Sequence, residues 1–128
     1  MATVIREADG MEEIRAMTGL MAEVWGDAFL DPGVCRAAQH AGGYLTGAWE
    51  GERLIGASMA FVGWLDGEVL LHSHATCTAL GLGSRGIGPA LKWHQRRWAL
   101  DRDIRRVEWT YDPLVARNAH FNLRVLGA

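Results

Sequence analysis

The chain has 128 residues, of which 49% are hydrophobic and 22% are charged. These values predict one compact domain over residues 1–128 and exclude a disordered or fibrous protein. The net charge is −2, yet residues 1–84 carry four basic and eleven acidic side chains, whereas residues 85–106 carry seven basic and two acidic ones. A short basic segment in an acidic protein predicts a local anion site and does not favour nucleic-acid binding.

The sequence shows neither an export signal nor a membrane-spanning segment. The first ten residues are charged and lack the apolar segment of a signal peptide. The longest uncharged run, residues 69–84, is shorter than the ~20 apolar residues of a membrane-spanning helix. Cys35 and Cys77 match neither a disulfide framework nor a zinc-ligand spacing. We therefore expect a cytoplasmic protein with free thiols and no membrane segment.

The first elements in chain order are a strand and two helices. Residues 3–8 are typical of a short strand. Asp9 and Glu12 then form a carboxylate version of the capping box, and the apolar residues that follow recur at helical spacing as far as Trp25. A proline- and glycine-containing turn precedes a second, shorter helix over residues 34–40.

The rest of the chain predicts an antiparallel meander followed by a helix, a strand and a helix. Glycine-containing turns separate the first three β-rich runs, as in antiparallel hairpins. The expected elements are strands over residues 44–49, 53–64 and 68–80, a helix over 90–103, a strand over 105–111 and a helix over 115–126. The order β-α-α-β-β-β-α-β-α predicts an α/β (α+β) domain with a mixed, mostly antiparallel sheet flanked by helices.

A glycine-rich loop joins the third strand of the meander to the next helix. It consists of Leu80, Gly81, Leu82, Gly83, Ser84, Arg85, Gly86, Ile87 and Gly88. Backbone N–H groups of such a loop, together with the positive end of the helix dipole, form a phosphate site. A Walker A loop would end in Lys-Ser/Thr, and a Rossmann loop would follow the first strand of a parallel unit. The remaining alternative is an ordinary tight turn.

The loop and the element order resemble the GNAT superfamily of acetyl-CoA-dependent acyltransferases. That family's pyrophosphate-binding motif, Gln/Arg-x-x-Gly-x-Gly/Ala, corresponds to residues 83–88, with Gly83 at the position of Gln or Arg. Asn118 corresponds to the family's asparagine that contacts coenzyme A. The resemblance covers residues 3–128 and implies that residues 80–88 bind acetyl-CoA or another acyl-CoA. It also implies an amine acceptor and a sheet that here lacks the family's last two strands. We expect no metal, because the sequence shows no third ligand at a recognisable spacing from His72 and His74.

Candidate catalytic residues lie on the strand before the loop. Alternation predicts one polar face with His72, His74, Thr76 and Thr78, and one small apolar face with Ser73, Ala75 and Cys77 among others. The family often has a glutamate at the position of Thr76, so His74 is the best candidate for the general base and His72 the second. The family often has a tyrosine that acts as the general acid, and Leu123 occupies its position here. Tyr111 and His120 remain as candidates for the acid. Two alternatives remain: buried structural histidines, or a metal site without a recognisable third ligand.

Three functional hypotheses follow. The first is acyl transfer from coenzyme A to an amine by direct attack in a ternary complex, with no nucleic acid or membrane as partner. The second is an acyl-CoA-binding module without turnover, favoured by the missing tyrosine, glutamate and final strands. The third is a homodimer formed through an open sheet edge.

Overall fold

The computed structural model describes residues 2–83 and 85–110. Within them lie five strands, β1 (Thr3–Glu7), β2 (Tyr44–Glu50), β3 (Arg53–Leu65), β4 (Glu68–Thr78) and β5 (Val107–Glu108), and the helices α1 (Gly10–Trp25), α2 (Pro32–His40) and α3 (Ile87–Leu100). The sequence-predicted order is confirmed as far as β5. The helix expected over residues 115–126 lies outside the described residues.

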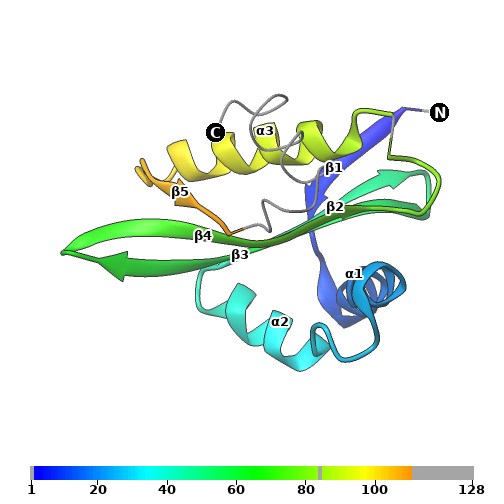
Figure 1. The fold of residues 1–128 in the computed structure, drawn as a ribbon, viewed down its shortest axis with the longest axis horizontal. Coiled ribbons are helices and arrows are strands. Elements are labelled where there is room, and N and C mark those ends of the chain that lie inside the picture. The colour runs from blue at the N-terminus through cyan, green and yellow to red at the C-terminus, as the bar shows by residue number, and fades with distance from the viewer. Residues whose placement is uncertain (1, 84, 111–128) are drawn as a thin grey trace.

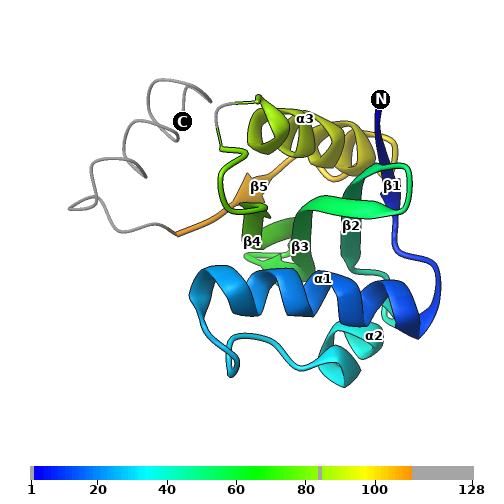
Figure 2. The same ribbon diagram turned by 90° about the vertical axis from the view of Figure 1, so that its right-hand side faces the viewer.

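The five strands form one sheet in the order β1-β2-β3-β4-β5. The first three pairings are antiparallel, and only β4 and β5 run parallel. Helices α1 and α2 cover one face of this sheet and α3 covers the other (Figures 1 and 2). None of the three helices in the described part is long and apolar enough to cross a membrane.

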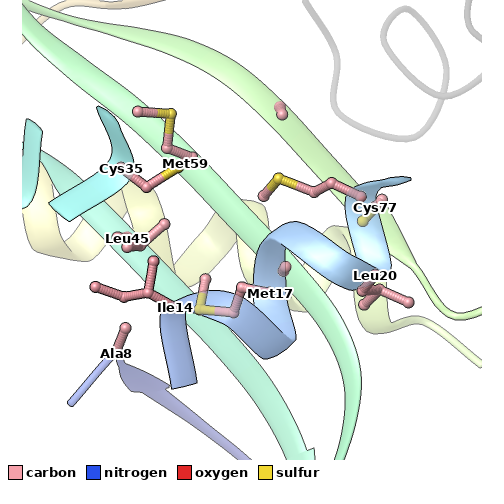
Figure 3. Close-up of a cluster of buried hydrophobic side chains, with 11 residues drawn as sticks. Ala8, Ile14, Met17, Leu20, Cys35, Leu45, Met59 and Cys77 are labelled. Carbon is pink, nitrogen blue, oxygen red and sulfur yellow. The ribbon is translucent and has the colours of Figure 1, made fainter. Parts of the chain in front are cut away.

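The main core lies between α1, α2 and the sheet. The apolar spacing of α1 places Ile14 and Met17 on the side that faces the sheet, where both are fully buried. Figure 3 shows these side chains with Leu45 and Met59 of the sheet and Cys35 of α2. Sulfur-containing side chains suit this space because they adapt to irregular gaps. The methionines of α1 therefore serve packing.

The start of α1 differs in detail from the expected capping box. Asp9 is the N-cap residue, but its side chain makes no capping hydrogen bond. Glu13 instead accepts from the backbone N–H of Asp9 at 2.8 Å and forms a two-point ion pair with Arg6, at 2.6 and 2.8 Å. The acceptor is thus one residue later than Glu12, because Arg6 of β1 fixes the Glu13 carboxylate there.

On the other face, α3 packs very close to the strands. A Cβ atom at Gly56 of β3 would lie 2.8 Å from Cγ2 of Ile87 and 3.1 Å from a methyl group of Leu91. A glycine at this position therefore lets the first turns of α3 approach the sheet. Ile87 and Leu91 are buried there together with Ala48 and Ile55. Because Ile87 belongs to the glycine-rich loop, this contact holds the end of that loop against the sheet.

Strand β4 contains a β-bulge at His74. Ala75 pairs with Met59 and Ser73 pairs with Ala60, so His74 is an extra residue without a partner on β3. Because a bulge shifts the alternation by one residue, the predicted division of β4 into a polar and an apolar face is wrong.

The faces of β4 are divided as follows. Ser73, Thr76 and Thr78 point toward α3, whereas the remaining residues of the bulge region, His72, His74, Ala75 and Cys77, point toward α1 and α2. The two histidines do share a face, as expected, but with small apolar residues and not with the threonines.

Candidate functional site

The glycine-rich loop opens the N-terminus of α3 toward solvent. Gly86 is the N-cap residue in the left-handed conformation, at φ 76°, and no side chain of the described residues caps this end. Pro89 has no N–H, and the backbone N–H groups of Ile87 and Gly88 have no backbone partner in the described part of the chain. Because N–H groups at the start of a helix and the helix dipole attract anions, this end of α3 can hold a phosphate.

The loop leaves room for a ligand at its glycines. A Cβ atom at Gly81 or Gly86 would meet nothing within 4 Å. Leu80 is 70% exposed, whereas Leu82 packs partly against the cluster beneath α3. Turn-like hydrogen bonds from Leu82 to Ala79 and from Arg85 to Leu82 fix the loop internally. Ser84, the remaining predicted member, lies outside the described residues.

Arg85 has a partner within the protein. Its guanidinium forms an ion pair with the Glu50 carboxylate at the end of β2. This pair ties the loop to the sheet and partly neutralises the charge that Arg85 adds near the α3 N-terminus. Backbone N–H groups are therefore the main anion-binding groups that the described loop offers.

The outer edge of β4 is only partly paired. Its pairing with β5 is limited to Leu71 with Val107 and His72 with Glu108. Over residues 73–78 no described strand pairs with this edge, and residues 79–86 lead from its end to α3. Since an unpaired strand edge presents N–H and C=O groups, an extended ligand can bind along β4 between the bulge and the loop.

His74 lies at the bulge between two aromatic rings. Its imidazole stacks on the ring of Phe29, with centroids 5.5 Å apart and planes 18° apart, and meets the ring of Phe61 at 5.6 Å and 61°. The pKa of His74 is lowered, mainly by partial burial and also by the nearby His72. A neutral imidazole at neutral pH can accept a proton, as the sequence-based assignment of a general base requires.

Cys77 lies on the same face as His74, whereas sequence alternation predicted opposite faces. Sharing a face with a histidine does not make Cys77 a nucleophile. The pKa of the Cys77 thiol is raised to about 11, mainly by burial, against which a hydrogen bond with the backbone of Ala57 acts, and with a smaller contribution from the nearby Glu23 carboxylate. The thiol therefore stays protonated and unreactive at neutral pH.

Lys92 is a residue that the sequence analysis missed. Its ammonium on α3 donates to Oγ of Ser73 at 2.7 Å and lies 4.5 Å from the centre of the Trp109 ring. Burial lowers the pKa of Lys92 to about 8. The residue lines a cavity of about 510 Å³ between α3 and β5, on the opposite side of the sheet from His74. One signal was available: Lys92 is the chain's single lysine among twelve arginines, and a lysine loses its proton far more readily than an arginine.

Three further candidate residues, Tyr111, Asn118 and His120, lie outside the described residues and stay predictions. Within residues 2–83 and 85–110, no group of three or more potential metal ligands occurs. His72 and His74 accordingly have no third ligand in this part of the chain.

Comparison with known proteins identifies the fold. No protein-family model matches the sequence, and no curated protein matches it. Among solved structures, the aminoglycoside N-acetyltransferase AAC(6′)-Iy in complex with CoA is similar, with a TM-score of 0.74 and 18% identity over 96% of this chain and 87% of that chain.

Two further structures are similar over a comparable length. One is an aminoglycoside acetyltransferase from an uncultured soil metagenomic sample, bound to sisomicin, with a TM-score of 0.78 and 12% identity over 94% of this chain and 84% of that one. The other is a transcriptional regulator from Bacillus halodurans C-125, with a TM-score of 0.80 and 20% identity over 97% and 91%. The chain thus has the GNAT-like fold of these acetyltransferases.

Proposed function

We infer that the protein transfers an acetyl or other acyl group from coenzyme A to an amine. The observation that carries this proposal is the N-terminus of α3, which no described side chain caps and which follows the edge of β4 that no described strand pairs over residues 73–78, beside His74. The fold supports it, because an acetyltransferase with CoA bound shares this fold. A fold alone does not define an activity, so the proposal depends on these residues.

The cofactor would bind along the loop and β4. The pyrophosphate would accept hydrogen bonds from the N–H groups of Ile87 and Gly88, where the dipole of α3 stabilises negative charge. The extended part of the acyl-CoA would run along residues 73–78, whose outward N–H and C=O groups can pair with amide groups. Contacts from Ser84, Arg85 and Asn118 belong to the same proposal.

The chemistry would be direct attack in a ternary complex. His74 takes a proton from the amine, the amine nitrogen forms a C–N bond with the thioester carbonyl carbon, and the C–S bond breaks. A backbone N–H of the β4 edge stabilises the developing negative charge on the carbonyl oxygen. The coenzyme A thiolate leaves and receives a proton, for which Tyr111 is the proposed donor. His72 is the second candidate for the base.

Calorimetric titration with acetyl-CoA tests the binding step. We expect Gly86→Ala to abolish or strongly weaken binding, because a Cβ atom strains the left-handed backbone and protrudes toward the ligand. Gly67→Ala is the matched control: Gly67 has nearly the same φ, 77°, and equal space, but lies in the β3–β4 turn. Equal binding by both variants would contradict the phosphate site.

Thiol release from acetyl-CoA in the presence of amines tests turnover. We expect His74→Gln to lose activity and to keep acetyl-CoA binding, whereas His40→Gln, at an exposed histidine of α2, changes neither. Because the pKa of His74 is lowered from 6.5, the rate should fall only as the pH drops below about 6.5. Binding without turnover for every amine would identify an acyl-CoA-binding module instead.

A further inference from the structure

A row of aromatic rings leads away from His74 along the α1–α2 face. Trp25, the last residue of α1, stacks on Phe29 with centroids 4.6 Å apart and planes 26° apart. Phe29 in turn stacks on His74, and Phe61 of β3 closes the other side of the imidazole. We call Trp25, Phe29 and Phe61 the aromatic cluster. It joins the helix connection to the β-bulge.

The aromatic cluster keeps much of its surface open. Trp25 is 44% exposed and Phe61 is 36% exposed, while Phe29 is partly buried because it packs against the main core. Packing thus fixes the position of the central ring and leaves its neighbours accessible. Exposed aromatic side chains that adjoin a polar reactive group are typical of a ligand site.

The surroundings of the aromatic cluster are acidic. Residues 23–31 include Glu23, Asp27 and Asp31 and contain no lysine or arginine. Glu23 lies near enough to Cys77 of β4 to raise the pKa of its thiol, so its carboxylate lies on the side of the sheet where His74 lies. Carboxylates and aromatic ring faces both attract cations. The charge therefore favours a protonated amine over an anion.

We propose that the aromatic cluster is the acceptor site and that it binds a primary amine carried on an aromatic or similarly flat apolar group. The flat group stacks on the exposed face of Trp25, whose other face rests on Phe29, and the ammonium group lies at His74. This inference rests on the proposed function, since it uses His74 as the base. The ammonium gives its proton to His74, the new C–N bond forms as the thioester C–S bond breaks, and the coenzyme A thiolate leaves. The overall products are the N-acyl amine, coenzyme A thiol and one proton.

The expected substrate is unlike a polar polyamine. An aminoglycoside such as sisomicin, which one of the similar structures binds, presents hydroxyl and amino groups that need polar partners. Aromatic ring faces cannot supply them. A small amine with a ring should therefore be preferred over both sisomicin and a small amine without a ring.

The experiment compares three amines with the full chain. The probes are 2-phenylethylamine, ethanolamine and sisomicin, each measured by thiol release from acetyl-CoA and, independently of turnover, by saturation-transfer NMR on the amine. The variants are Trp25→Ala, Phe29→Ala and the conservative Trp25→Phe. The matched control is Trp64→Ala, because Trp64 is 75% exposed on β3 and pairs with Val69, whose side chain packs on the α3 side of the sheet.

The proposal expects 2-phenylethylamine to bind best and to react fastest. Loss of one stacking ring should weaken its binding about three- to tenfold, whereas Trp25→Phe and Trp64→Ala should retain it. Acetyl-CoA binding should be unchanged in every variant. If Phe29→Ala unfolds the core, Trp25→Ala still tests the proposal, because Trp25 is exposed and its loss should leave the core intact.

Two results would overturn this inference and leave the proposed function intact. One is faster turnover of sisomicin or ethanolamine than of 2-phenylethylamine. The other is binding of 2-phenylethylamine that Trp25→Ala does not weaken. Failure of acetyl-CoA to bind would instead refute the proposed function, and in that case the NMR titration with the variants still decides whether the aromatic cluster binds the amine.

Discussion

The buried amine of Lys92 leads to a prediction about stability and pH. Its pKa is about 8 in the folded protein, against 10.5 for an exposed lysine, because burial disfavours the charged form. The difference corresponds to about 3 kcal/mol. Between these two pKa values the unfolded chain binds more protons than the folded one, so stability rises as the pH rises. The roughly 3 kcal/mol of stability is fully present above pH 10.5, where the amine is neutral in both states. It is lost progressively as the pH falls from 10.5 through 8, where the buried amine becomes charged.

The test replaces Lys92 by methionine, which has a similar length and no charge. Urea unfolding of the wild type and of Lys92→Met is measured at pH 7.5, 8.5 and 9.5. We expect the unfolding free energy of the wild type, relative to the variant, to rise by about 2 kcal/mol over this range. The comparison between the two proteins matters because Cys35 and Cys77, whose pKa values are raised, lower stability at alkaline pH equally in both.

Arg97→Met provides the control on the same helix. Arg97 is exposed, and an arginine keeps its charge throughout this pH range. Its variant should therefore follow the pH profile of the wild type. A difference between wild type and Lys92→Met that stays constant within about 0.5 kcal/mol would refute the reasoning, because the ammonium would then bear no burial penalty.

Three other substitutions test the packing of the sheet. Gly56→Ala should cost about 1–3 kcal/mol, because the new methyl group meets Ile87 at 2.8 Å, whereas Gly63→Ala, with its nearest contact at 3.9 Å, should cost little in the same urea titration. Glu13→Gln should cost about 0.5–1 kcal/mol at pH 7. Since Arg6 lowers the pKa of Glu13 from 4.5, the wild type should lose this advantage as the pH falls below 4.5, and equal stability of the two proteins at pH 7 would contradict the role of the ion pair. Tyr44→Phe should lower the free energy of unfolding in urea by about 1 kcal/mol, because it removes the hydroxyl group that forms a 2.8 Å hydrogen bond with Nδ1 of His94. An unchanged urea midpoint would argue against that bond.

Local patterns predicted the order of the elements because each described element carries its own signal. The apolar spacing of α1 and the glycine-containing turn at Asp66-Gly67 act over a few residues, and the structure confirms both. The resemblance of the loop to acetyltransferases likewise predicted the fold. Such patterns could not predict long-range contacts. The Arg6 partner of Glu13 decided the cap of α1, and Ser73 of β4 helped to decide the environment of Lys92.

The β-bulge shows why regular alternation failed at the site itself. Without the bulge, Thr76 and Thr78 would point into the apolar core beneath α1, where their hydroxyl groups would have no partners. With it, Ala75 and Cys77 fill that core, and Thr76 exchanges a hydrogen bond with Ser58 at 2.8 Å on the opposite face.

The same shift leaves His74 without a partner on β3, at the point where the pairing of β4 with β5 has ended. One inserted residue thus satisfies the core packing and places an imidazole between the aromatic cluster and the strand edge that no described strand pairs. Because both effects have the same cause, the irregularity that misled the sequence analysis is the feature that would bring the base, the acyl donor and the amine together.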